Sequence, residues 1–160
     1  MTDSQQVTNF THSLTIQAPV GVILDAFFNP DMLATWWRIN RSLCVPRPLG
    51  CYAVEWEPTD WTDPVLGRLG GVFHGHVITF DPQHEFFVAD CYWMAPDGEP
   101  IGPMAFEVSC RRSPSGVVVT VRQTGYESGE RWSRYYQFLS AGLKASLERL
   151  QKMLENRWRP

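Results

Sequence analysis

The pattern in this sequence most typical of a metal site is His74-Gly75-His76, because side chains two residues apart on a strand point to the same face. Pairing of the flanking segments would set Cys91 opposite His74, and two imidazoles with a thiolate suit zinc. However, no fourth ligand has a suitable spacing, and this pairing places the histidines on the outward face of the sheet. We therefore expect exposed or hydrogen-bonded histidines, no native metal and no cofactor.

Nucleophilic catalysis has little support in the sequence. The four cysteines, Cys44, Cys51, Cys91 and Cys110, form no Cys-x-x-Cys pair, and none stands beside a histidine. There is no Gly-x-Ser-x-Gly elbow, and the glycine-rich run 67–71 lacks the lysine and the following helix of a phosphate-binding loop. We expect reduced thiols, as in the cytosol.

One carboxylate and two phenols could supply acid–base chemistry if they face an interior. If the turn between two expected strands pairs Asp81 with His84, then Asp90 and Tyr92 lie on the inner face of their strand. A buried carboxyl group without a cationic partner has a raised pKa, which suits an acid, a base or a ligand anchor. Asp90, Tyr92 and Tyr136 are therefore weak catalytic candidates.

The elements that would position these residues follow from the hydrophobic periodicity. Alternation of apolar and polar residues predicts strands at 8–17, 50–57, 71–80, 85–94, 104–110 and 117–125, with loops at 38–49, 58–69 and 95–103. Steps of three and four residues predict short helices at 20–28 and 32–37, the second capped by Asp31, and a long helix from 130 to about 156. Such a helix would be ~40 Å long. Its apolar stripe needs a large surface, which one face of an antiparallel sheet provides.

Composition narrows the class of protein. Of the 160 residues 44% are hydrophobic, with seven Trp, nine Phe and five Tyr, which excludes a disordered chain. The net charge is −3, so we expect no nucleic-acid partner, which would require a strong basic patch. The first residues lack the pattern of a signal peptide, and no apolar stretch reaches the ~20 residues that span a membrane. We expect a single cytoplasmic domain over residues 1–160.

Four short motifs carry a resemblance to a known family. They are Ile16-Gln-Ala-Pro19 before a helix, the stretch from Phe28 to Trp37, the stretch from Gly71 to Pro82, and the last helix centred on Gly142. In this order they resemble the START/Bet v 1-like (SRPBCC) superfamily, in particular the branch named for the activator of heat-shock protein 90 ATPase. The resemblance implies an α+β helix-grip fold. In it, a curved antiparallel sheet of about six strands wraps around a long C-terminal helix, and two short helices follow the first strand.

The resemblance also implies a cavity between the sheet and the last helix for an apolar small molecule. For each candidate alone, ordinary core packing is the alternative. The expected ligand-binding residues are Trp36, Tyr52, Val54, Trp56, Phe73, Val77, Val88, Asp90, Tyr92, Met104, Phe106, Val108, Val119, Val121, Tyr136, Leu139 and Leu143. Asp90, Gln123 and the tyrosine hydroxyls are the polar groups that would orient a ligand.

Because members of this superfamily include carriers, enzymes and a chaperone-stimulating domain, the fold does not decide the function. The leading hypothesis is a carrier that binds a small hydrophobic molecule, lipid-like or aromatic, without covalent chemistry. The alternative is an enzyme that uses the same cavity on a polyketide-like or aromatic substrate, with Asp90 as acid or base. A third hypothesis is a domain that contacts a chaperone through its surface, and a homodimer contact is also left open. A filled core and an exposed patch near Trp36 or Trp61 would favour this third hypothesis.

Overall fold

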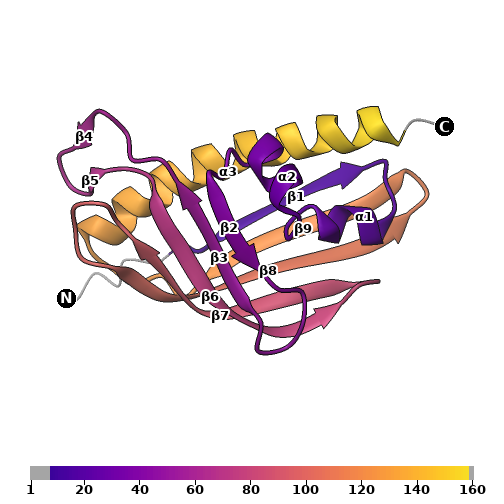
Figure 1. The fold of residues 1–160 in the computed structure, drawn as a ribbon, viewed down its shortest axis with the longest axis horizontal. Coiled ribbons are helices and arrows are strands. Elements are labelled where there is room, and N and C mark those ends of the chain that lie inside the picture. Colours follow the sequence, from indigo (N-terminus) through magenta and orange to yellow (C-terminus); the bar gives the residue numbers. More distant parts are fainter. Residues whose placement is uncertain (1–7, 159–160) are drawn as a thin grey trace, which may run out of the picture.

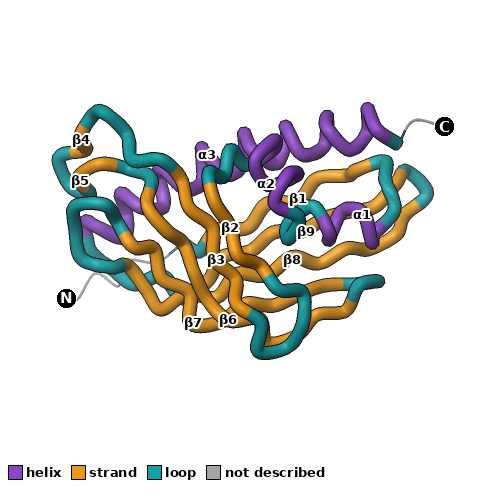
Figure 2. The backbone as a smooth tube through the Cα atoms, in the orientation of Figure 1, coloured by secondary structure: helices purple, strands orange, loops and turns teal. Residues whose placement is uncertain are grey.

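The chain folds into a curved antiparallel sheet with a long helix across its inner face (Figures 1 and 2). The computed structural model describes residues 8–158, so the segment on which we base the expectation of no signal peptide lies outside the described residues. The strands of the main sheet lie in the order β1-β9-β8-β7-β6-β3-β2. Their bounds are β1 Phe10–Ile16, β2 Arg41–Cys44, β3 Cys51–Trp56, β6 Gly71–Asp81, β7 Glu85–Met94, β8 Ile101–Ser113 and β9 Gly116–Thr124.

Three helices accompany the sheet within the described residues. Helices α1, Val20–Asp25, and α2, Pro30–Trp36, connect the two edge strands β1 and β2. Helix α3, Glu130–Arg157, has 28 residues and is therefore about 42 Å long. Its buried residues recur mainly at steps of three and four, so they form one stripe that faces the sheet. This arrangement confirms the expected α+β helix-grip fold.

Strand β7 contains a bulge that the alternation of its residues does not indicate. Val77 of β6 pairs with Val88 of β7 as expected. After Val88, the register of β7 shifts in its pairing with β6 and also in its pairing with β8. Asp90 takes a left-handed backbone conformation at the shift, with φ of 53°. On the neighbouring strand, a Cβ at Gly75 would lie 2.7 Å from the Ala89 carbonyl oxygen. A glycine at this position therefore lets the two backbones approach each other.

The bulge corrects the expected placement of three side chains. An extra residue in a strand with a two-residue period moves every later side chain to the opposite face. Asp90 is therefore exposed rather than internal, and Tyr92 lies on the outer face with its ring stacked on His74 at 6.1 Å. Cys91 is buried on the inner face, whereas the expectation placed it opposite His74, whose partner is Tyr92. Trp93 also points inward.

Two local expectations, the cap of α2 and the loop at 38–49, were wrong. The cap of α2 is Asn29, whose side-chain oxygen accepts hydrogen bonds from the backbone nitrogens of Asp31 at 3.0 Å and Met32 at 3.2 Å. Strand β2 lies in the expected loop 38–49, and its partner β3 defines it, with Arg41 opposite Glu55. The main sheet consequently has seven strands instead of about six.

The interior beneath α1 and α2 is filled by six large rings, which we call the aromatic core: Phe27, Phe28, Trp36, Tyr52, Phe86 and Phe106. Most neighbouring rings pack edge-on or tilted, for example Phe27 against Trp36 at 4.9 Å between centroids, and Tyr52 stacks on Phe86 at 6.0 Å. Their polar atoms are satisfied by backbone, because Tyr52 Oη donates to the Phe27 carbonyl at 2.8 Å and Trp36 Nε1 donates to the Ala26 carbonyl at 2.8 Å. The six rings of the aromatic core therefore have no unpaired polar atom.

Candidate ligand-binding site

A cavity of about 430 Å³ lies between the sheet and the part of α3 from Tyr135 to Arg149, next to the aromatic core. Its aromatic walls are Trp37, Trp56, Phe73, Trp93, Tyr135 and Phe138. Leucines 66, 69, 139 and 143 add aliphatic surface. Helix α3 borders the cavity from Tyr135 to Arg149, which corresponds to about 21 Å along the helix axis. The cavity is therefore elongated along α3 and mainly apolar.

Only some of the expected ligand-binding residues border this cavity. Trp56, Phe73, Leu139 and Leu143 do so, as does the polar candidate Gln123. Ten others are buried in the packed part of the interior and are absent from the lining: Trp36, Tyr52, Val54, Val77, Val88, Met104, Phe106, Val108, Val119 and Val121. Asp90 and Tyr92 lie outside it because of the β7 bulge.

Tyr136 also differs from its expected position. It is half-buried, with its ring 6.1 Å from that of Tyr126, while its neighbour Tyr135 is buried and borders the cavity. Tyr135 lies four residues before Leu139 and eight before Leu143, so it belongs to their stripe on α3. This spacing was the available signal for Tyr135. The bulge that turns Trp93 inward, by contrast, has no comparable sequence signal.

The end of the cavity near the start of α3 carries a polar cluster around Gln123. The Gln123 side-chain oxygen accepts hydrogen bonds from the hydroxyls of Tyr126 at 2.6 Å and Tyr135 at 2.8 Å. Burial raises the pKa of both tyrosines, so both remain protonated donors. The Gln123 amide nitrogen has no partner among residues 8–158. In that range, every fully enclosed side-chain nitrogen has a hydrogen-bond partner. The Gln123 nitrogen is therefore not fully enclosed, and it borders the cavity.

The other end of the cavity is bordered by charged side chains. Arg38, which follows α2 with φ of 58°, and Arg149 of α3 both contribute to the lining. Arg149 is held in place, because its Nε donates to the Trp36 carbonyl at 3.1 Å and its Nη2 donates to the Ser146 hydroxyl at 2.8 Å. Glu57 is the one carboxylate in the lining. Among the charged lining residues, positive charge therefore predominates.

Residues 57–70, which we call the cover segment, close one side of the cavity and contain the short strands β4, Thr62–Asp63, and β5, Gly67–Arg68. Asp63 ties this segment to α3. One carboxylate oxygen accepts from Arg134 Nε at 2.9 Å and Nη2 at 2.7 Å, and the other accepts from two backbone nitrogens of the segment at 3.0 Å. Hydrogen bonding to Arg134 lowers the pKa of the buried Asp63, so this carboxyl group is ionised.

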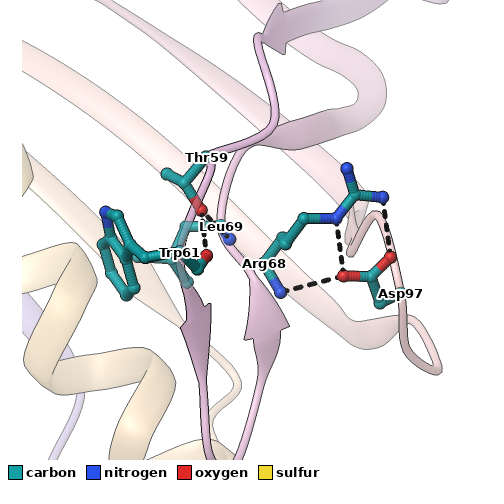
Figure 3. Close-up of polar contacts among 5 residues, drawn as sticks. All are labelled: Thr59, Trp61, Arg68, Leu69 and Asp97. Carbon is teal, nitrogen blue, oxygen red and sulfur yellow. Dashed lines mark hydrogen bonds and ion pairs between the residues drawn. The ribbon is translucent and has the colours of Figure 1, made fainter.

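A second ion pair holds the cover segment at its far side (Figure 3). Arg68 Nε and Nη2 each donate to Asp97 at 2.8 Å, and the Arg68 backbone nitrogen donates to the same carboxylate at 3.1 Å. These bonds lower the pKa of Asp97 to about 2. Thr59 crosslinks the base of the segment by accepting from the Leu69 nitrogen at 3.0 Å and donating to the Trp61 carbonyl at 2.8 Å (Figure 3).

The histidines and cysteines of residues 8–158 lie outside the lining of this cavity. Among residues 8–158, no three His, Cys, Asp or Glu side chains lie where they could share a metal ion. The cysteines are free thiols, and burial raises the pKa of Cys44, Cys91 and Cys110 to about 12. None of the helices in the described range is long and apolar enough to cross a membrane.

Comparison with known proteins identifies the fold class. No family model matches the chain, and no curated protein sequence matches it significantly. Protein MLL2253 of Mesorhizobium loti has a similar structure, with 16% identity over 93% of this chain and 98% of its own, at a TM-score of 0.70. CV1439 of Chromobacterium violaceum matches at 18% identity over 93% and 99%, with a TM-score of 0.66. The Aha1 dimer of Colwellia psychrerythraea matches at 14% identity over 93% and 97%, with a TM-score of 0.67. The likeness is one of fold, and it agrees with the resemblance of the motifs.

Proposed function

We propose that this protein binds a small hydrophobic molecule in the cavity between the sheet and α3. The observation that carries this proposal is the cavity of about 430 Å³ with walls of aromatic and leucine side chains. Small-molecule sites typically have volumes of roughly 300–1,000 Å³, mostly apolar walls and a few polar groups that orient the ligand. The Gln123 amide and the two arginines are such groups here.

The positions of the polar residues favour binding over the two alternative functions. The enzyme hypothesis assigned acid–base catalysis to Asp90, which is exposed on the outer face and cannot reach the cavity. A filled interior would favour the hypothesis of a surface-interaction domain, whereas this interior contains a cavity of about 430 Å³. Trp61, whose exposure would favour a partner surface, is 52% exposed but packs on Phe138 at 5.9 Å between ring centroids.

Native mass spectrometry of protein purified without detergent tests the proposal. We expect a reproducible additional mass that disappears on denaturation. In Leu139→Trp the larger ring occupies the cavity, so the additional mass should be lost, while Lys144→Trp adds the same ring on an exposed position of α3 and should retain it. An additional mass of unchanged occupancy in Leu139→Trp would place the ligand elsewhere and contradict the proposal.

A second measurement covers a ligand that is lost during purification. Trp37, Trp56 and Trp93 border the cavity, so entry of an apolar molecule should change tryptophan emission. Titration with aliphatic and aromatic probes should change that emission and raise the melting temperature, because a ligand of the native state stabilises it. If no mass co-purifies over several preparations and no probe changes either signal, the cavity is not a binding site.

A further inference from the structure

Two arginines at one end of the cavity have no carboxylate partner. Arg41, Arg68 and Arg134 each form an ion pair, but within residues 8–158 neither Arg38 nor Arg149 does so. Arg149 uses Nε and Nη2 for the Trp36 carbonyl and the Ser146 hydroxyl, which fixes the plane of its guanidinium group. Its Nη1 nitrogen has no protein acceptor in this range. The site therefore presents one fixed guanidinium group, that of Arg149, and a second positive charge on the exposed Arg38.

The two arginines also repel each other. Burial and the charge of Arg38 lower the pKa of Arg149. Glu57, the carboxylate of the lining, accepts a hydrogen bond from Asn40 Nδ2 at 2.8 Å and forms no ion pair with either arginine. An anion between the guanidinium groups would relieve their repulsion. A planar carboxylate matches the paired donors of a guanidinium group in geometry as well as in charge.

The opposite end of the cavity offers a different kind of donor. Gln123 is only 2% exposed, and its oxygen is already occupied by two tyrosine hydroxyls, so its amide N–H groups are what it presents to the cavity. Such donors favour a ligand oxygen, whether hydroxyl or carbonyl. The helix segment between Tyr135, which binds Gln123, and Arg149 extends about 21 Å, and its cavity-facing side chains between these ends are mainly apolar.

We propose that the ligand of this cavity is an elongated amphipathic carboxylate. Its carboxylate lies between Arg38 and Arg149, its apolar body lies along α3, and an oxygen near the far end accepts from the Gln123 amide. This inference rests on the proposed binding function and adds the charge and orientation of the ligand. It commits to an organic anion because the lining carries two guanidinium groups against one carboxylate, and the half-buried Arg149 keeps its Nη1 nitrogen for a further acceptor, although Arg38 itself is exposed to solvent.

Chain-matched probes test the charge of the ligand. Dodecanoate, dodecan-1-ol and dodecyltrimethylammonium share one apolar chain and differ in the head group. We expect the wild-type protein to bind dodecanoate at least about tenfold more tightly than the alcohol, measured by tryptophan emission and calorimetry below the micelle concentration, and to bind the cation most weakly. Raising the salt concentration should weaken only the binding of dodecanoate.

Matched variants locate the charge effect. Arg38→Gln should weaken dodecanoate binding about tenfold and leave binding of the alcohol unchanged. Lys144→Gln removes the same charge from an exposed position of α3 outside the lining and should change neither affinity. Because Arg149 also binds the Trp36 carbonyl, Arg149→Lys serves as its variant. This variant keeps the positive charge but loses the paired donors of the guanidinium group, so it should lower the affinity for dodecanoate. Its melting temperature shows whether it is folded.

The outcomes separate this inference from the function on which it rests. Equal affinity for dodecanoate and dodecan-1-ol, or tighter binding of the cation, overturns the carboxylate inference while binding in the cavity stands. Equal loss of dodecanoate affinity in Arg38→Gln and Lys144→Gln shows a general charge effect and also overturns it. If none of the three probes binds but a mass co-purifies or an aromatic probe binds, the elongated carboxylate is overturned and binding in the cavity stands. If there is no co-purifying mass and no probe binds, the binding function itself is contradicted.

Discussion

The interior of this protein has a packed half and a hollow half, and one helix borders both. In the packed half, the second part of α3 buries Leu147, Leu150 and Leu154 completely, alongside the aromatic core. In the hollow half, the helix borders the cavity between Tyr135 and Arg149, and Phe138 and Leu139 are only partly buried there. Both halves are rich in aromatic residues. The difference shows that the number of aromatic side chains does not decide whether a core is filled. The orientation of each ring and the segment that covers it matter as much.

The polar groups differ between the halves in the same way. In the aromatic core, the polar atoms of Trp36 and Tyr52 bond to backbone carbonyls nearby. In the hollow half, Gln123 and Arg149 satisfy only some of their donors with protein groups. Donors on a cavity wall that lack a protein acceptor are available to a ligand or to water. This availability is the physical argument for function in this half.

Truncation of a ring should give the largest difference between the halves. Phe106→Ala in the aromatic core creates a new cavity and should lower the free energy of unfolding by about 3–5 kcal/mol. Phe73→Ala enlarges a cavity that already exists, and its loss should be smaller by about 1 kcal/mol or more. Urea denaturation measures both values. Equal losses would contradict the division of the interior into two halves.

Enlargement of a leucine tests the comparison in the opposite direction. Leu147→Trp forces a larger ring into a fully buried position and should lower the free energy of unfolding by about 1–3 kcal/mol. Leu139→Trp extends into the cavity, so we expect a loss of less than about 1 kcal/mol. The two variants carry the same substitution on the same helix. If Leu139→Trp were the less stable, the cavity would be too small for a tryptophan ring.

Acid should loosen the hollow half through the cover segment. Asp97 has a pKa of about 2 in the folded protein and 3.8 as a reference value, so its contribution is complete above about pH 4 and is lost as the pH falls toward 2. The melting temperature of Asp97→Asn should therefore be lower than that of wild type at pH 6, and this difference should disappear between pH 4 and 2. Calorimetry at several pH values measures it.

The control for this acid effect lies in the same segment. Asp60 is exposed and forms no ion pair within residues 8–158, so Asp60→Asn should follow the wild-type melting temperature over the whole pH range. If Asp60→Asn behaved like Asp97→Asn, the effect would reflect net charge and not the ion pair with Arg68.

The smallest expected effect is a stabilisation. Gly142 lies inside α3, where glycine is less favourable than alanine by about 0.5–1 kcal/mol, and the added methyl group meets no atom. Gly142→Ala should therefore raise the free energy of unfolding by about that amount, as urea denaturation can show. A destabilisation would mean that the Cβ position is not open.

Much of the fold could be predicted from the sequence, because period-two alternation and the leucine stripe of α3 are local signals. Trp56 and Leu143 were assigned to the site from such patterns, and both border the cavity. Asp90 was misplaced because the bulge depends on the pairing of strands, which one strand's own alternation does not reveal. Arg38 and Arg149 were missed because only the packing of α2 against α3 brings such distant parts of the chain to one cavity.

The bulge in β7 shifts the alternation of the strand by one residue, and its consequence is a neutral inner face on this strand. With uninterrupted alternation, the carboxylate of Asp90 would point into the interior, where Gly75 and Val88 lie. With the shift, Cys91 and Trp93 point inward instead, and Trp93 Nε1 donates to the Gly70 carbonyl at 2.7 Å, which ties the sheet to the cover segment. One irregular residue thus keeps a carboxylate out of the interior and turns a tryptophan toward the cavity without any change of composition.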